Sequence, residues 1–202
     1  MKGIIFFLIV MFVVFLLIEK CGDNSAKFEK LKHKEDSILN SFKRRYNFNV
    51  DSLGNSLKDI KLVNSYDAST IKMPLICFGI FDDSLKFHHS LNKYLPESLT
   101  SYKSNEISTA VIVANSKKQL GYYNNGKTIA YQINTYLYFI DLFSHKVILS
   151  RILEGGMPPE SKEYLHSPPE YLFGDAASKV DILKVIQEVS NKKFPIRHDI
   201  SH

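Results

Sequence analysis

The strongest constraint on how this chain can fold is its first segment, because Gly3 to Ile18 is an uninterrupted run of apolar side chains. As a helix this run would span about 24 Å, slightly less than the roughly 30 Å hydrocarbon core of a bilayer. Lys2 and Lys20 flank the run and can extend their charged ends to the two interfaces. A helix without a polar face is not suited to the surface of a soluble domain. We therefore expect residues 1–19 to be an uncleaved N-terminal membrane anchor, a single-pass transmembrane helix that contacts lipid through residues 3–18.

Two other fates of this segment remain open. A cleaved signal peptide needs a small-x-small site after the apolar run, and only Asn24-Ser25-Ala26 comes close to one. In a lipoprotein the modified cysteine would be Cys21, but Lys20 stands where such signals carry a small residue. Lysines after the run favour a cytoplasmic domain, whereas an apolar segment at the extreme N-terminus most often leads its domain outward. We expect the domain on the outer, periplasmic or extracellular side of a bacterial envelope.

The positive charge of the chain is concentrated directly after the apolar run. The net charge is +5, and the stretch from Glu19 to Tyr46 contains eight basic and five acidic residues. From residue 47 onward the numbers are 17 and 16, so the rest of the chain is close to neutral. Because a nucleic-acid-binding domain needs a basic face, we expect no nucleic acid among the partners.

Residues 20–46 are expected to form a basic amphipathic helix or stalk, because apolar side chains recur there at three- and four-residue spacings. The stripe consists of Phe28, Leu31, Ile38, Leu39, Phe42 and Tyr46. A basic helix next to an anchor can lie on anionic lipid headgroups. The alternative is a helix whose lysines are simply solvated. The chain then divides into the anchor (1–19), this segment (20–46) and one domain (47–202).

Alternation of apolar and polar residues predicts a four-stranded antiparallel meander within that domain. The expected strands are 109–114, 119–123, 129–139 and 147–153. The first turn is expected at Ser116-Lys117-Lys118. Asn125-Gly126 is the strongest hairpin signal, because both turn positions need a positive φ. The regular alternation of the third strand indicates one buried and one partly solvated face.

The flanking segments complete an α+β fold. The apolar run 74–81 predicts a buried strand that ends at Asp82-Asp83, and residues 84–94 predict a short helix. A final helix is expected from about Asp175 or Ser178 to Asn191, capped by Ser178 with Asp181 and packed against the sheet.

The segment from Gly155 to Gly174 is the first candidate for a binding site. Its four prolines predict neither a helix nor a paired strand, and long irregular segments in compact domains are often functional. A row of tyrosines on the second and third strands (Tyr122, Tyr123, Tyr136 and Tyr138) is the second candidate, since amphipathic rings on a solvated sheet face suit peptides or glycans. The alternative is a sheet face covered by a helix. The candidate partner-binding residues are Tyr164, Tyr171, Phe173, Tyr136 and Tyr138.

We predict no catalytic, cofactor-binding or metal-binding residues. His88 and His89 are adjacent and should point apart, and no cysteine or carboxylate stands at zinc spacing from a histidine. Asp82-Asp83 fits a turn better than an acid–base pair, and neither a nucleophile elbow nor a phosphate loop is present. The favoured hypothesis is a membrane-anchored, non-enzymatic envelope module that binds a protein or a glycan. The alternative is a hydrolase with a dispersed site, in which His166, Glu163 or Glu170 would meet His88 or Asp82.

A loose pattern also runs through the second half of the chain. Its elements are Leu95-Pro96, Gly121-Tyr122-Tyr123, Asp141, Gly155-Gly156-Met157-Pro158-Pro159 and Gly174 before the final helix. In this order they resemble a family of uncharacterised bacterial membrane-anchored envelope proteins. The resemblance covers about half of the chain, roughly residues 95–190, and implies no activity, cofactor or site residue.

Overall fold

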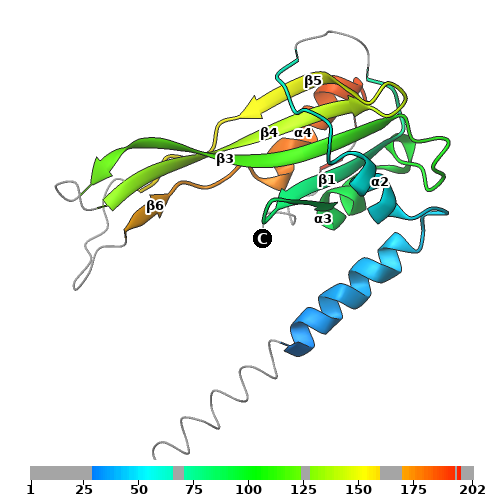
Figure 1. Ribbon diagram of the computed structural model, residues 1–202, viewed down its shortest axis with the longest axis horizontal. Coiled ribbons are helices and arrows are strands. Elements are labelled where there is room, and N and C mark those ends of the chain that lie inside the picture. The colour runs from blue at the N-terminus through cyan, green and yellow to red at the C-terminus, as the bar shows by residue number, and fades with distance from the viewer. Residues whose placement is uncertain (1–28, 66–70, 124–127, 160–169, 194, 197–202) are drawn as a thin grey trace, which may run out of the picture. The chain divides into compact units, whose positions relative to one another are not determined.

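The computed structural model describes residues 29–65, 71–123, 128–159, 170–193 and 195–196 (Figure 1). The chain divides into two compact units, Met1–Arg45 and Tyr46–His202.

The described part of the first unit is helical over residues 29–43, within the segment for which a helix was expected. Two residues of its apolar stripe, Leu31 and Ile38, are exposed. Among the described residues, no helix combines the length and the apolar character that crossing a membrane requires. The predicted anchor, residues 3–18, lies outside the described residues.

The second unit is built on one mixed sheet with the strand order β2-β1-β3-β4-β5, and β6 is also paired to β4. The strands are β1 (Leu75–Phe81), β2 (Ser84–Phe87), β3 (Thr109–Tyr123), β4 (Thr128–Asp141), β5 (Lys146–Leu153) and β6 (Tyr171–Phe173). The helices are α2 (Val50–Ser56), α3 (His89–Tyr94), the 3-10 helix η1 (Glu97–Leu99) and α4 (Lys179–Ser190). The α+β class is confirmed. The sheet is mixed rather than purely antiparallel, because β1 with β3 and β4 with β6 are parallel pairs.

The predicted turn at Ser116-Lys117-Lys118 is wrong, because β3 runs without a break from Thr109 to Tyr123. Its register with β4 shifts only between Gln119 and Gly121, at a β-bulge. The antiparallel meander therefore has three strands, β3, β4 and β5, and not four. The Asn125-Gly126 turn lies outside the described residues, although Tyr123 and Thr128 on its two sides are paired.

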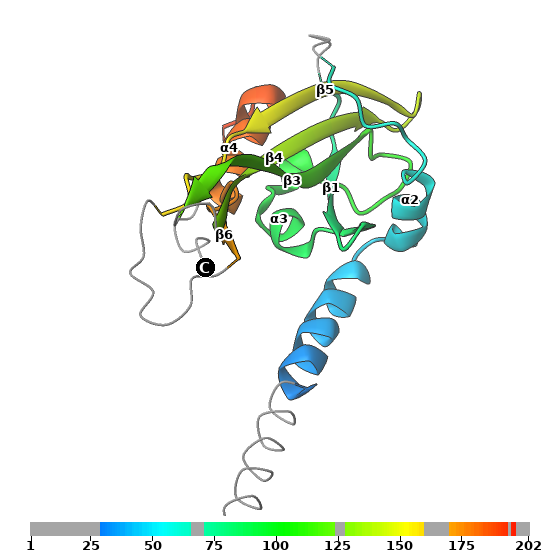
Figure 2. The same ribbon diagram turned by 60° about the vertical axis from the view of Figure 1, so that its left-hand side comes forward.

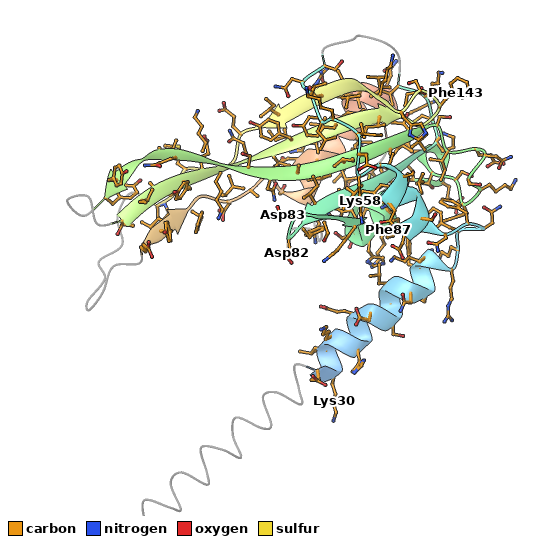
Figure 3. The ribbon with its side chains drawn as sticks, viewed as in Figure 1. Lys30, Lys58, Asp82, Asp83, Phe87 and Phe143 are labelled. Atoms are coloured by element: carbon orange, nitrogen blue, oxygen red, sulfur yellow. The ribbon has the colours of Figure 1, made fainter. Side chains whose placement is uncertain are left out.

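The predicted buried strand is confirmed as β1, and its hairpin with β2 turns at Asp82 and Asp83 (Figure 3). The φ angles of these residues are 47° and 58°, as a two-residue turn with two left-handed positions requires. Residues 84–94 are not one short helix as predicted. They form β2 and α3, with His88 as the N-cap between them.

Both faces of the sheet are covered in its globular half, with α2 and α4 on opposite sides (Figure 2). On one face, buried residues of the strands pack with α3 and α4; they are Cys77, Val111, Leu137, Phe139, Leu91, Leu183 and Ile186. On the other face the fully buried residues are Ile76, Phe78, Ile112 and Ile140. Gly54 of α2 lies against this second face, since a Cβ there would be 3.1 Å from the Phe78 ring.

The final helix begins where the sequence predicted. The Ser178 side chain accepts a hydrogen bond from the backbone N–H of Asp181, and Asn191 ends the helix in the left-handed conformation with φ 51°. The buried side of α4 is Ile182, Leu183, Val185 and Ile186. The expected packing of this helix against the sheet is therefore confirmed.

The segment between β5 and α4 contains a paired strand, contrary to the prediction, because Tyr171–Phe173 pair with β4 as β6. Glycines allow the chain to pass close to itself around this strand. A Cβ at Gly155 would lie 2.0 Å from the Ile133 carbonyl oxygen, and one at Gly174 would lie 1.9 Å from that of Gly156. Residues 160–169 of this segment lie outside the described residues.

Candidate binding surface

β3 and β4 extend beyond the globular half of the sheet as a long ribbon (Figure 1). Pairing of β3 with β1 ends at Val113, and pairing of β4 with β5 reaches only as far as Thr135. On the edge that β5 leaves free, β6 pairs with residues 129–131. We call residues 115–123 and 128–134, together with β6, the distal ribbon.

Four aromatic side chains gather on one face of the distal ribbon. Tyr131 lies opposite Phe173, and Ile129 lies opposite both Tyr171 and Tyr122. Residues directly opposite each other in neighbouring strands share a face, as do residues two apart in one strand. We call Tyr122, Tyr131, Tyr171 and Phe173 the aromatic face.

Three rings of the aromatic face lie next to one another. The Tyr131 and Phe173 centroids are 5.5 Å apart at an interplanar angle of 19°, and those of Tyr171 and Phe173 are 6.4 Å apart at 27°. Tyr131 and Tyr171 are 6.1 Å apart at 40°. Tyr122, Tyr171 and Phe173 are 62%, 42% and 44% exposed, so much of each side chain is accessible to a partner.

Aromatic pairs in the globular half pack in the opposite way. Tyr46 meets Phe48, Phe87 and Tyr102 at interplanar angles of 81°, 79° and 74°, and Phe78 meets Phe87 at 80°. Such edge-to-face contacts place the edge of one ring on the face of the next. The rings of the distal ribbon instead lie at small angles to one another, in a stacked arrangement.

Charged groups border the aromatic face. The Lys117 ammonium reaches across the ribbon to 4.9 Å from the centroid of the Phe173 ring, within cation–π distance. The Tyr171 hydroxyl donates to the Glu170 carboxylate, and this hydrogen bond raises the pKa of the phenol. The surface therefore combines apolar ring faces with one cation and one carboxylate.

The outer edge of the distal ribbon is poorly suited to pair with another strand. In the described part of the chain, no strand pairs with β3 beyond Val113 on the side away from β4. Lys117, Lys118 and the bulge before Gly121 lie along this stretch. Lysines and bulges on edge strands oppose strand addition by a second chain. The face of the ribbon, rather than its edge, is the surface available to a partner.

The five predicted contact residues do not form one surface. Tyr171 and Phe173 lie together on the aromatic face, whereas Tyr164 lies outside the described residues. Tyr136 and Tyr138 stack on each other at 6.1 Å and 10°, half-buried, on the opposite face of β4 from Tyr131.

The sequence reasoning included Tyr122 in its tyrosine row but missed Tyr131 and Lys117 as members of this surface. Tyr131 shares a face of β4 with the core residues Leu137 and Phe139, but it lies beyond the core. The polar run Asn115 to Gln119 gave no clear signal, because it fits the predicted turn as well as a strand that has left the core.

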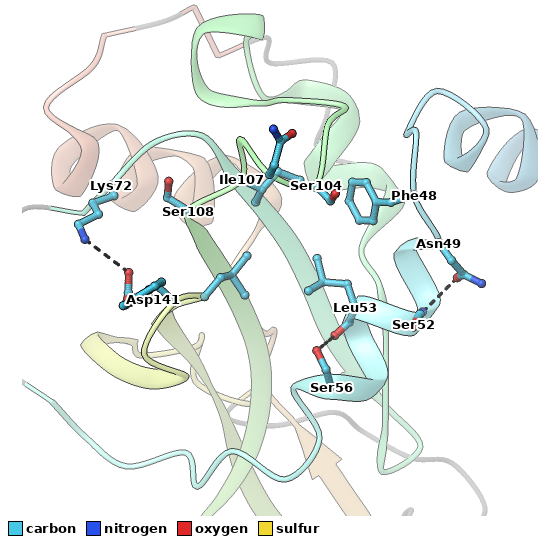
Figure 4. Close-up of a pocket in the computed structure, with 13 residues that line it drawn as sticks. Phe48, Asn49, Ser52, Leu53, Ser56, Lys72, Ser104, Ile107, Ser108 and Asp141 are labelled. Carbon is cyan, nitrogen blue, oxygen red and sulfur yellow. Dashed lines mark hydrogen bonds and ion pairs between the residues drawn. The ribbon is translucent and has the colours of Figure 1, made fainter.

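A hollow of about 730 Å³ lies between α2, the loop before β3 and the β4–β5 turn (Figure 4). Its polar groups are mostly engaged within the fold. The Asn49 Oδ1 accepts from the Ser52 N–H at 3.0 Å, and the Ser56 hydroxyl donates to the Leu53 carbonyl at 2.7 Å.

The same hollow includes Asp141, whose carboxylate lies 3.9 Å from the Lys72 ammonium. Hydrogen bonds from Ser144 lower the pKa of Asp141. Phe143 beside it is 93% exposed and projects at the β4–β5 turn (Figure 3). The polar lining of this hollow therefore stabilises the fold, and it offers no converging reactive groups.

The groups named for a dispersed hydrolase site do not meet in the described part of the chain. Glu170 is engaged with Tyr171 on the distal ribbon, and Asp82 lies in the β1–β2 turn. His166 and Glu163 lie outside the described residues. Within the described residues, no three His, Cys, Asp or Glu side chains are placed to hold a metal ion.

His88 has a lowered pKa, and its contacts are those of a helix cap. Its Nδ1 accepts the Leu91 backbone N–H at 3.5 Å and lies 3.3 Å from the Ser90 hydroxyl. Burial, with smaller contributions from the charges of Lys179 and His89, lowers the pKa of His88 to about 4. Among the described residues no carboxylate lines the cleft around His88, so a Ser–His–carboxylate arrangement is not formed there.

No protein-family model, no curated protein and no solved structure matches this chain.

Proposed function

We propose that this chain is a membrane-anchored, non-enzymatic module that binds a protein or glycan partner through the aromatic face. The observation that carries the proposal is the cluster of three neighbouring rings, Tyr131, Tyr171 and Phe173, with two of them more than 40% exposed. Exposed aromatic clusters on soluble domains are typical of interaction sites.

The chemistry of the surface fits either class of partner. Ring faces stack on the C–H face of a sugar or on apolar side chains of a peptide, and phenol hydroxyls add hydrogen bonds. Lys117 at the border can meet an acidic group of the partner. The lysines and the bulge on the edge of β3 favour docking on the face of the ribbon over strand addition.

The location belongs to the same proposal. Residues 3–18 would hold the chain in the membrane, and the basic segment 20–46 would lie near anionic headgroups, with the domain on the outer side of a bacterial envelope. Lipid modification at Cys21 is the alternative route to the same membrane.

The test is site-specific photo-crosslinking of the full-length chain in its own membranes. A photoreactive amino acid at Gln119, which lies opposite Tyr131 on the aromatic face, should give a discrete adduct with the partner. The matched control position is Phe143, which is exposed and lies in the β4–β5 turn, just beyond the end of β4 that is far from the distal ribbon.

Phe173→Ala should weaken the Gln119 adduct, because truncating an aromatic contact residue typically costs about 1–3 kcal/mol of binding. The substitution should leave the melting temperature nearly unchanged, since the Phe173 side chain is 44% exposed. The proposal would be contradicted if both positions gave adducts in equal yield. It would also be contradicted if Phe173→Ala left the yield of the Gln119 adduct unchanged.

A further inference from the structure

A second cleft, of about 440 Å³, opens in the globular half of the sheet between the beginnings of α3 and α4. Its walls come from the β1–β2 hairpin, the middle of β3 and β4, and both helices. It is lined by Phe81, Phe87, His88, His89, Ser90, Val113, Asn115, Thr135, Ala177, Lys179 and Ile182. We call this space the histidine cleft.

We propose that the histidine cleft binds a small organic anion, a carboxylate or phosphate attached to an apolar body. This is a second site, independent of the partner surface proposed above. Clefts of about 300–1,000 Å³ with an apolar wall and a few converging polar groups are the usual form of small-molecule sites.

The polar groups of the cleft are donors and cations. His88 Nδ1 accepts the Leu91 backbone N–H, so the hydrogen of the neutral imidazole lies on Nε2 and makes this nitrogen a donor. Asn115 Oδ1 accepts from the Thr135 hydroxyl at 2.8 Å, which leaves the Asn115 NH₂ group as the end that can donate to a ligand. Lys179 is the ammonium group of this lining, and its charge is close enough to act on His88.

Carboxylates are missing from this lining in the described part of the chain, although 21 acidic residues occur in the sequence. A cleft lined by hydrogen-bond donors, one ammonium group and two imidazoles, but by no carboxylate, favours an anionic ligand over a cationic one. This charge selection is what distinguishes the histidine cleft from the hollow beside Asp141.

The rest of the lining is largely apolar, and a glycine shapes it. It includes Phe81, Val113 and Ile182, and the Phe81 and His88 rings meet edge-to-face at 5.7 Å and 60°. A Cβ at Gly79 would lie 2.5 Å from the Phe81 ring and 3.1 Å from His88 Cδ2. Gly79 therefore provides the room in which these two rings form one side of the cleft.

The experiment titrates the full-length chain, in a neutral detergent, with three probes of one shape and different charge. Benzoate is the anion, benzamide is neutral and benzamidine is the cation. The readout is the movement of the His88 and His89 imidazole resonances in NMR spectra. We expect benzoate to bind with a Kd at least about tenfold lower than that of benzamide, a difference of about 1.4 kcal/mol, and benzamidine to leave both resonances in place.

Variants then test the groups that select charge. Lys179→Met and Asn115→Asp should each weaken benzoate several-fold and leave benzamide unchanged. Lys192→Met, an exposed lysine just beyond α4, is the matched control and should change nothing. Phe173→Ala should also leave benzoate binding unchanged, which separates this site from the aromatic face. Binding of benzamidine as tight as that of benzoate, or imidazole resonances that do not move with benzoate in the unsubstituted protein, would overturn the proposal.

Discussion

His88 shows how one residue can serve the fold and a cleft at the same time. Its backbone N–H donates to the Cys77 carbonyl, its Nδ1 caps α3, and its ring lines the histidine cleft. Burial is the main cause of the lowered pKa of His88, whereas a hydrogen bond to the backbone acts in the opposite direction.

This lowered pKa predicts a pH dependence of stability. The pKa of His88 is about 4 in the folded chain, against 6.5 for an unperturbed histidine. Between these values the unfolded chain binds a proton that the folded chain does not bind, so the free energy of unfolding falls as the pH drops from about 6.5 towards 4. The loss should be on the order of 2–3 kcal/mol at the acid end.

Thermal unfolding followed from pH 7.5 to 4 measures this effect. His88→Asn keeps an acceptor at the N-cap and removes the titrating group, so its stability should fall less over the same range. His145→Asn is the control: His145 has φ 54° in an exposed turn, where asparagine fits, and the substitution should preserve the pH dependence. Parallel curves for the unsubstituted protein and His88→Asn would contradict the assignment to His88.

At the scale of elements, the close passage of the chain at Gly155 and Gly174 holds β6 against β4. The Gly174 N–H donates to the Tyr131 carbonyl, and the Gly156 N–H donates to that of Asp175. Because β6 carries Tyr171 and Phe173, the aromatic face depends on two positions that only glycine can occupy without a shift of backbone.

Gly174→Ala should therefore destabilise the domain and damage the aromatic face together. Its Cβ would meet backbone atoms of Gly156 and Met157 at 1.9–3.0 Å, and backbone cannot rotate away as a side chain can. We expect a loss of about 2–4 kcal/mol in the free energy of unfolding, measured by urea denaturation. The photo-crosslink from Gln119 should also disappear.

Gly121→Ala is the matched control, because it lies in the same ribbon and a Cβ there would have nothing within 4 Å. Its effect should stay within about 0.5 kcal/mol, as for exposed positions in general. If Gly174→Ala and Gly121→Ala lower the free energy of unfolding by the same amount, the close approach of the backbone at Gly174 is not the reason that glycine is needed there.

The same elements explain what the sequence could predict. The final helix was predictable because Ser178 is a strong cap and its apolar stripe has one period. Strand β1 was predictable because residues 74–81 form a compact apolar run. In the structure its first five residues are all buried. In both cases the signal lies within the element itself.

The failures occurred where the decisive interaction is not local. Asn115 to Leu120 are all exposed, so in sequence this half of β3 cannot be distinguished from a turn. β6 has only three residues and is defined by its pairing with Ile129 to Tyr131, about 40 positions earlier in the chain. The aromatic face shares this origin: Tyr171 and Phe173 were predicted as contact residues, but Tyr131 and Lys117 join them only through that pairing.

At the scale of the whole molecule, both proposed sites belong to the second unit and lie along one face of β3 and β4. Asn115 of the histidine cleft and Lys117 beside the aromatic face are two residues apart on β3, and Thr135 and Tyr131, four residues apart on β4, lie on the same face. An extended anionic ligand that occupies the cleft would therefore lead towards the aromatic rings.

The first unit should instead decide where the molecule is. Full-length chain should sediment with membranes and resist extraction with alkaline carbonate, because sixteen consecutive apolar residues from Gly3 to Ile18 have no other way to leave water. A chain that begins at Asn24 should stay in the soluble fraction and melt at the temperature of the full-length domain. Val13→Arg with Phe15→Arg should weaken membrane retention, since each arginine at the centre of a span costs about 2.5–3.5 kcal/mol.

The intact mass of the protein then separates the three possible fates of the first segment. An uncleaved anchor keeps Met1 or Lys2 as its first residue, whereas a cleaved signal peptide removes the apolar run. A lipoprotein begins at a Cys21 whose mass is increased by lipid, and Cys21→Ser should abolish this increase. Full-length protein in the soluble fraction, with its apolar run intact, would show that this segment does not anchor the chain.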